Sequence, residues 1–199
     1  MKEPTPSPRD IARELARRYS TMTHEELDLL ESIIEVHKVK KGEMILREGD
    51  YATCINYIER GMTRQFYYKG EKELTEHIGV EKTIVFSIES LFKEIPTTLQ
   101  MHALENSLIY SLPVKKLEEI ALHSANIQIL FRKILEESLI NSQKHADLVR
   151  FESALDRYKK YAQMRPQVIQ RAPLIYVASY LQMTPETLSR VRAQVLNEK

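Results

Sequence analysis

The chain has 199 residues, of which 43% are hydrophobic and 29% are charged, and its formal net charge is +1. This composition is typical of a globular protein, and no run approaches the roughly 18 apolar residues of a membrane span. The opening residues MKEPTPSPRD have no apolar core, which argues against a secretory signal, and their prolines predict a disordered arm over residues 1–10.

Cysteine and histidine usage argues against several kinds of functional site. Cys54 is the only cysteine, so the chain forms no disulfide framework and no cysteine-ligated iron–sulfur cluster. The six histidines show no zinc-ligand spacing, and a haem ligand at His77 or His102 is the weaker alternative. Glycine-rich phosphate loops and nucleophile elbows are missing. We therefore expect no enzyme activity, no metal and no evident cofactor, in a cytoplasmic protein.

The net charge hides an asymmetry between the two ends of the chain. Residues 1–149 contain 20 Lys and Arg against 24 Asp and Glu, whereas residues 150–199 contain 9 against 4. A basic C-terminal segment on an acidic body favours contact with a polyanion. Chance is the alternative explanation, so the charge needs a motif beside it.

The first two-thirds of the chain changes from helical to strand periodicity. Residues 11–34 are predicted to be helical, with Thr23 and Glu26 forming a capping box. From Val36 to Leu112, short apolar runs alternate with turn signals, which favours a β-barrel or jelly-roll. The predicted strands are Glu43–Arg47, Ile55–Glu59, Thr63–Tyr68, Glu73–Ile78, Thr83–Ile88, Leu99–Leu104 and Ser107–Leu112.

A long helix is predicted over residues 125–149, after a shorter helix that begins at Pro113. It contains neither glycine nor proline and would be well over 30 Å long. Its broad apolar stripe needs a partner, either in its own domain or in a second copy of the chain. The next predicted helix spans residues 154–163 and is capped by Ser153.

Residues 173–192 contain the pattern that indicates function. One face of a short helix is marked by apolar residues at helical spacing: Leu174, Val177, Ala178 and Leu181. Residues 182–183 leave room only for a tight turn. Thr184 and Pro185 are typical of an N-cap and a first helical residue. The second helix then buries Leu188, Val191 and Val195, and the whole pattern predicts a helix-turn-helix.

The outer, N-terminal face of this second helix carries the expected DNA contacts. Arg190 can hold guanine with two hydrogen bonds, and Glu186 can accept one from cytosine. Phosphate contacts are expected from Arg171, Thr184, Ser189 and Arg192. Pro185 and Thr187 complete the predicted DNA-binding set. The alternative is that Glu186 and Arg190 form only a surface ion pair.

Several stretches of this chain resemble one known family. Residues 153–158 (SALDRY) and 175–192 (IYVASYLQMTPETLSRVR) closely resemble Crp/Fnr-family transcription regulators, most of all those common in Bacteroidetes. Residues 41–50 (KGEMILREGD) and 57–61 (YIERG) are similar to early strands of the family's cyclic-nucleotide-binding β-roll. The resemblance covers about residues 11–197.

The resemblance implies an α+β fold that is divided into three parts. It implies a β-roll (jelly-roll-like) sensor domain over residues 11–124, a dimerisation helix over 125–149 and a winged helix-turn-helix over 150–199. The family's recognition-helix glutamate and arginine match Glu186 and Arg190. Gln182 replaces the usual turn glycine, which predicts mild strain, and Pro185 stands where some members carry an arginine.

The effector pocket is where this sequence departs from the resemblance. Cyclic-nucleotide binders of the family hold the ribose and phosphate with a Gly-Glu and an Arg-Ser pair, and by our alignment the glutamate falls at Ile88 and the arginine at Thr97. The corresponding pocket residues are Phe86, Ser87, Ile88, Glu89, Ser90, Thr97 and Thr98. A cyclic phosphate without a cationic partner loses a contact of about 1.5–3 kcal/mol, so cyclic AMP is not the expected effector.

We therefore expect a homodimeric, sequence-specific transcription regulator that binds double-stranded DNA and has an unknown effector or none. RNA polymerase is a further expected partner, and no membrane is. The alternative is a ligand-binding β-roll module whose helical tail mediates protein–protein contacts. A salt-dependent shift of duplex DNA separates the two functions.

Overall fold

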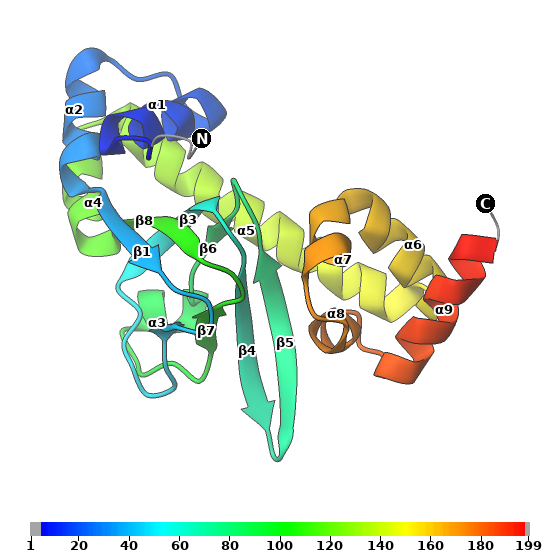
Figure 1. Ribbon diagram of the computed structural model, residues 1–199. Helices are drawn as coiled ribbons and strands as arrows, with labels where there is room; N and C mark the ends of the chain where they lie inside the picture. Colours follow the sequence, from blue (N-terminus) through cyan, green and yellow to red (C-terminus); the bar gives the residue numbers. More distant parts are fainter. Residues whose placement is uncertain (1–4, 198–199) are drawn as a thin grey trace.

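The computed structural model describes residues 5–197 and contains a β-roll built from two antiparallel sheets (Figure 1). The strands of the first sheet lie in the order β1 (Glu35–Val39), β8 (Ser107–Pro113), β3 (Cys54–Arg60) and β6 (Ile84–Val85). Those of the second sheet lie in the order β2 (Met44–Leu46), β7 (Gln100–Ala103), β4 (Thr63–Lys69) and β5 (Lys72–Gly79). The predicted jelly-roll-like β fold is therefore present.

Alternate residues of the first sheet face two different cores. Successive side chains of a strand point to opposite faces, so Ile58 packs inward against Val85 and Met101, between the sheets. Tyr57 and Tyr110 point outward and are fully buried under helices. This alternation makes the first sheet the base on which the N-terminal helices rest.

Four helices cover the outer face of the first sheet: α1 (Pro8–Tyr19), α2 (His24–Ile33), α4 (Val114–Ala121) and the first half of α5 (Ala125–Phe151) (Figure 1). Capping boxes begin two of them. The side chain of Ser7 accepts a hydrogen bond from the backbone N–H of Asp10, and the side chain of Thr23 accepts one from the backbone N–H of Glu26. In return, each carboxylate accepts a hydrogen bond from the backbone N–H of its cap residue. The capping box predicted at Thr23 is confirmed.

The prediction of a disordered arm over residues 1–10 is wrong for residues 7–10, which cap and begin α1. Ser7 caps α1, and Pro8 occupies its first position, where its fixed φ suits a helix. The backbone carbonyl of Pro6 also accepts a hydrogen bond from Tyr110 Oη. Residues 1–4 lie outside the described part of the chain.

Some local elements of the sensor domain differ from the predicted ones. The predicted strand Thr83–Ile88 shortens to the two residues of β6, because α3 (Ile88–Lys93) begins at its end. A positive φ of 100° at Gly61 turns β3 into β4, and a Cβ there would lie 2.3 Å from Ser107 Oγ. Glycine is therefore required at this crossing of the two sheets.

The C-terminal lobe, residues 154–197, consists of α6 (Ala154–Met164), α7 (Pro166–Arg171), α8 (Leu174–Tyr180) and α9 (Pro185–Asn197). The wing implied by the resemblance is not found among residues 5–197, since the segment before the helix-turn-helix forms the short helix α7, with Pro166 at its start. The core of the lobe continues into the β-roll through Met62, Ile78, Val80 and Leu104.

The helix α5 joins the β-roll to the C-terminal lobe (Figure 1). It is an uninterrupted helix of 27 residues, as the lack of glycine and proline predicted. Its first half is buried against α1 and α4, and its stretch over residues 139–144 is exposed. Over residues 5–197, every helix is too short or too polar to cross a membrane.

Candidate nucleic-acid interface

The helix-turn-helix predicted from the sequence forms as α8, a tight turn and α9. Its two helices share a core in which Val177, Ala178, Leu181 and Leu188 are fully buried. The backbone N–H of Met183 donates to Ala178 O at 3.0 Å and closes the turn. The hydroxyl of Thr184 accepts from Thr187 N at 3.2 Å, so Thr184 caps α9 as predicted.

The turn between the two helices is strained at one residue and braced at another. Gln182 has φ +51°, in the left-handed region that favours glycine, which confirms the expected strain. Arg157 of α6 donates from Nη1 to Leu181 O at 2.8 Å and to Gln182 O at 3.3 Å. The turn carbonyls therefore have a cationic partner, which stabilises this unfavourable backbone conformation. No motif around Arg157 in the sequence indicates this role.

The predicted reading face lies exposed on the N-terminal half of α9. Pro185, Glu186, Ser189 and Arg190 are all exposed. Arg190 Nη2 donates to Thr187 Oγ1 at 3.3 Å, and no ion pair joins Arg190 to Glu186 in residues 5–197. A hydrogen bond from Thr184 lowers the pKa of Glu186, so its carboxylate is charged at neutral pH. These two side chains are therefore available to a ligand.

The two arginines predicted to contact phosphate, Arg192 and Arg171, differ in whether they already have partners in the protein. Arg192 is half-buried on α9 and has no hydrogen-bond or ion-pair partner in the part of the chain that the structure describes. Arg171 is engaged: its guanidinium donates to Glu81 at 2.8 Å twice and to Glu105 at 3.1 and 2.5 Å. These bonds use all three nitrogens of the guanidinium, and the phosphate contact of Arg171 stays a prediction. Arg171 ties the C-terminal lobe to two turns of the β-roll.

The electrostatics of this contact agree with its geometry. Partial burial alone would raise the pKa of Glu81, but hydrogen bonds from Arg171 outweigh it and lower that pKa. Hydrogen bonds to Glu105 and Glu81 raise the pKa of Arg171 in turn. The three groups are charged together, as a bidentate arginine clamp on two carboxylates.

The predicted effector pocket is closed by the protein's own side chains. Ser87 Oγ and Thr97 Oγ1 are buried and lie 3.0 Å apart. Behind them, Gln65 Nε2 donates to the carbonyl of Phe86 at 3.1 Å. Thr97, the position at which the arginine of cyclic-nucleotide binders was expected, therefore has a neutral hydroxyl that bonds to the protein itself.

The remaining predicted pocket residues do not converge on one cavity. Ile88 is 53% exposed on α3, and Thr98 is also exposed. Glu89 pairs with Lys93 at 2.7 Å on the surface of α3. Ser90 is buried but bridges Ala52 N and Ile95 O. The structure thus gathers Phe86, Ser87 and Thr97 but leaves the other predicted residues in separate roles.

A larger cleft of about 710 Å³ opens between the edge strands β1 and β2. Val39, Leu46 and Met101 line its apolar walls. At its inner end Ser111 Oγ donates to Asn56 Oδ1 at 2.6 Å, and both side chains are buried. Of the predicted pocket residues only Ser87 lines this cleft, so it is a hollow of the β-roll that the sequence analysis did not find.

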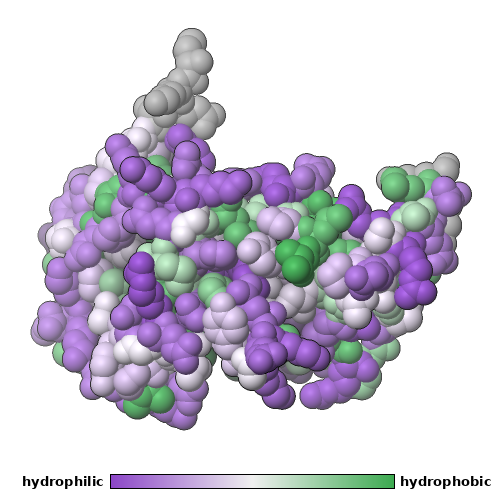
Figure 2. Space-filling model, turned by 60° about the horizontal axis from the view of Figure 1, so that its bottom comes forward, coloured by the Kyte–Doolittle hydropathy of each residue, from purple (hydrophilic) through white to green (hydrophobic). Residues whose placement is uncertain are grey.

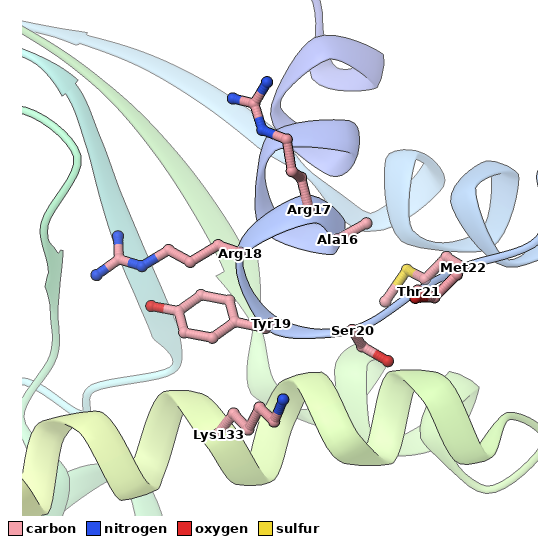
Figure 3. A pocket seen from close by; sticks show the side chains of 8 residues that line it. All are labelled: Ala16, Arg17, Arg18, Tyr19, Ser20, Thr21, Met22 and Lys133. Carbon is pink, nitrogen blue, oxygen red and sulfur yellow. The ribbon is translucent and has the colours of Figure 1, made fainter.

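A second hollow, between α1 and α5, carries three cations, Arg17, Arg18 and Lys133 (Figure 3). Their charged ends point in different directions in the close-up view. Arg17 pairs with Glu14, and Arg18 pairs with Glu137, whose carboxylate also accepts from Tyr19 Oη at 2.7 Å. The cations therefore form no common anion site.

Comparison with known proteins agrees with this architecture. Residues 36–124 match the family profile described as "Cyclic nucleotide-binding domain". No curated protein matches the sequence. Among solved structures, FixK2 from Bradyrhizobium japonicum is similar with 16% identity and a TM-score of 0.69, over 83% of this chain and 86% of that one.

Two further solved structures show the same likeness. A putative Crp/Fnr-family transcriptional regulator from Eubacterium rectale is 14% identical with a TM-score of 0.67, over 89% of this chain and 85% of that one. The catabolite activator protein of Thermus thermophilus is 19% identical with a TM-score of 0.55, over 92% and 87%. At these identities the likeness establishes the fold.

This chain therefore shares its fold with these three structures: a β-roll joined by one long helix to a helix-turn-helix. The family profile matched by residues 36–124 covers the β-roll and α4. The finer likeness to members from Bacteroidetes stays a prediction.

Proposed function

We propose that this protein is a homodimeric transcription regulator that reads duplex DNA with α9. The observation that carries the proposal is the exposed N-terminal face of α9, where Glu186 and Arg190 both face solvent above a fully buried helix-turn-helix core. Such a face fits a major groove, in which arginine and glutamate distinguish base pairs by hydrogen bonding. Because the target is DNA, we place its action in the cytoplasm.

Dimerisation is proposed through α5. Leu139 is 67% exposed and Ile140 51% exposed in the stretch between the β-roll and the C-terminal lobe. Figure 2 shows hydrophobic atoms gathered near the middle of the molecule, towards that lobe. A second copy of α5 would cover this surface and bring two α9 helices to successive major grooves, about 34 Å apart. RNA polymerase is a further proposed partner, as expected for a regulator of this architecture.

The effector is proposed to be something other than cyclic AMP, or to be absent. Ser87 and Thr97 bond to each other and Gln65 bonds to the carbonyl of Phe86, and all of these groups are neutral, so a cyclic phosphate would have to displace these bonds without gaining an ion pair. The cleft beside Asn56 and Ser111 supports a second candidate function, a ligand-binding β-roll whose helical tail contacts proteins.

One experiment tests the proposal directly: selection of bound sequences from random duplex DNA by the purified, unliganded protein, followed by titration at several salt concentrations. We expect an enriched, two-fold symmetric site whose affinity falls as salt rises. Sedimentation at micromolar concentration should show a dimer. Failure to enrich any sequence, with no salt-dependent binding of duplex DNA, would favour the second candidate function.

A further inference from the structure

Arg64 of β4 is a buried cation at the boundary between the β-roll and the C-terminal lobe. Only 1% of its side chain is exposed. A buried guanidinium is unfavourable unless its donors and its charge are matched. Both kinds of partner come from the neighbouring strand β5: Arg64 Nε donates to Thr75 Oγ1 at 2.8 Å, and Nη1 pairs with Glu73. Two of the three guanidinium nitrogens, and the charge, thus have partners within the β-roll.

The same guanidinium lies against aromatic rings from two different parts of the protein. Its Cζ lies 4.5 Å from the ring centre of Phe66, which is in β4 like Arg64 itself. The ring centre of Tyr176 lies 3.8 Å from the same Cζ. Tyr176 belongs to α8, the first helix of the helix-turn-helix. A desolvated cation–π contact of this kind is worth about 2 kcal/mol, or roughly thirtyfold in an equilibrium constant.

A second contact fixes α8 on the same strand. The backbone N–H of Thr75 in β5 donates to Ser179 Oγ at 2.8 Å. Ser179 lies three residues after Tyr176, so it is on the same side of α8. Two points of attachment along one helix face determine both its position and its rotation about its axis.

We propose that Arg64 is a positioning residue for DNA reading: by holding Tyr176 it docks α8 on the β-roll and so sets the direction in which α9 presents its outer face. The orientation passes from α8 to α9 because Val177 and Leu181 pack in one core with Leu188. The docking of α8 is argued from the contacts of Arg64 and Ser179 and does not depend on the proposed function, whereas its effect on DNA rests on that function.

The amide of Thr75 reports the docking, because its hydrogen bond ends on α8. The experiment compares the full-length protein with Arg64→Met, which keeps an unbranched apolar side chain, and with Tyr176→Leu, which removes the ring from the other side. Arg60→Met, at an exposed arginine of β3, is the matched control. Amide hydrogen exchange followed by NMR measures protection at Thr75 and, as an internal reference, at Tyr110 in β8.

We expect protection at Thr75 to fall by about tenfold or more in Arg64→Met and Tyr176→Leu, with Tyr110 unchanged and Arg60→Met unaffected. Affinity for the selected DNA site should fall in the same two variants. Unchanged Thr75 protection in either folded variant would overturn the docking role, and reduced protection with unchanged DNA affinity would overturn the positioning role. If the unaltered protein bound no DNA, the proposed function would fail, while the docking would still be decided at Thr75.

Discussion

Arg171 in α7 and Glu81 in the turn after β5 are joined by two parallel hydrogen bonds of 2.8 Å, across 90 residues of sequence. The same guanidinium holds Glu105 in the neighbouring turn. Its side chain is 29% exposed, so solvent screens the contact in part, but its fork geometry is among the stronger ones for an ion pair. This residue therefore acts in the docking of the two lobes.

Arg171→Ala should lower the stability of the protein without changing the salt dependence of its affinity for DNA. Removing the guanidinium leaves two carboxylates facing each other, and with the discount for exposure we expect a loss of about 1 kcal/mol in the free energy of unfolding. Arg192→Ala should do the opposite, with little change in stability and a salt slope lowered by about one unit. Denaturant unfolding and salt titrations of the two variants check both outcomes. A lowered salt slope in Arg171→Ala would mean that the clamp opens on DNA.

Arg190→Ala should relax sequence discrimination. Arg190 is exposed and bonded only to Thr187 within the described residues, so it is available to a base edge. We expect a loss of about 1–3 kcal/mol on the selected site and a relaxed base choice at one position in each half-site. Competition between the selected and scrambled duplexes measures this. An unchanged ratio of the two affinities would remove Arg190 from direct readout.

Gln182→Gly should stabilise the protein. A non-glycine residue at φ +51° costs about 1–2 kcal/mol, and glycine relieves this while adding somewhat less than 1 kcal/mol of chain entropy to the unfolded state. The expected net gain is about 0.5–1 kcal/mol in denaturant unfolding. Gln182→Ala is the matched control, because it keeps the Cβ and should bring no gain. A glycine variant less stable than the alanine one would contradict the prediction.

Stability should fall as the pH drops from about 6.5 towards 5. Burial, with the nearby charge of Arg165, lowers the pKa of His77 to about 4, and burial also lowers the pKa of His102 and His145. A histidine whose pKa is lower in the folded state contributes stability that is complete above its unfolded pKa and is lost as the pH falls towards the folded one. The side chain of His77 is only partly buried. We therefore expect it to account for a loss of about 1–2 kcal/mol in the free energy of unfolding between pH 7 and pH 5.

Unfolding at pH 7 and pH 5 measures this loss, and His77→Gln should reduce it. His37→Gln, at an exposed position of β1, is the control and should leave the difference as it is. Equal losses in the unaltered protein and His77→Gln would show that this histidine does not contribute.

Cyclic AMP should bind negligibly. Calorimetry with the unaltered protein should show no heat of binding at micromolar concentrations, since Thr97 offers a hydroxyl where a cation would be needed and that hydroxyl is already bonded to Ser87. Micromolar affinity would mean that the group formed by Ser87, Thr97 and Gln65 rearranges to admit a phosphate.

The features that could be predicted from sequence are those made by residues close together in the chain. The caps at Thr23 and Ser153, the strained turn at Gln182 and the exposure of Glu186 and Arg190 all follow from a few neighbouring residues. The sequence pattern of residues 173–192 thus predicted the helix-turn-helix and its outer face correctly.

The features that could not be predicted depend on distant partners. Arg171 looks like a phosphate ligand in its own segment, and only the fold brings Glu105 to it from 66 residues away. In the same way, neither Arg64 nor Tyr176 has a pattern around it that indicates the other. The wing came from the resemblance, whereas locally Pro166 starts a helix there.

Strand β5 is the outer strand of its sheet, next to β4 alone. An outer strand exposes unpaired backbone groups that can recruit a strand from another chain, and proteins protect such strands by covering them. Here the hydroxyl of Ser179 accepts the hydrogen bond of one of those groups, the amide of Thr75, and α8 lies along the strand. Any event that lifts the C-terminal lobe from the β-roll would therefore uncover a template for aggregation, so variants that weaken this docking should lose solubility before they lose their fold.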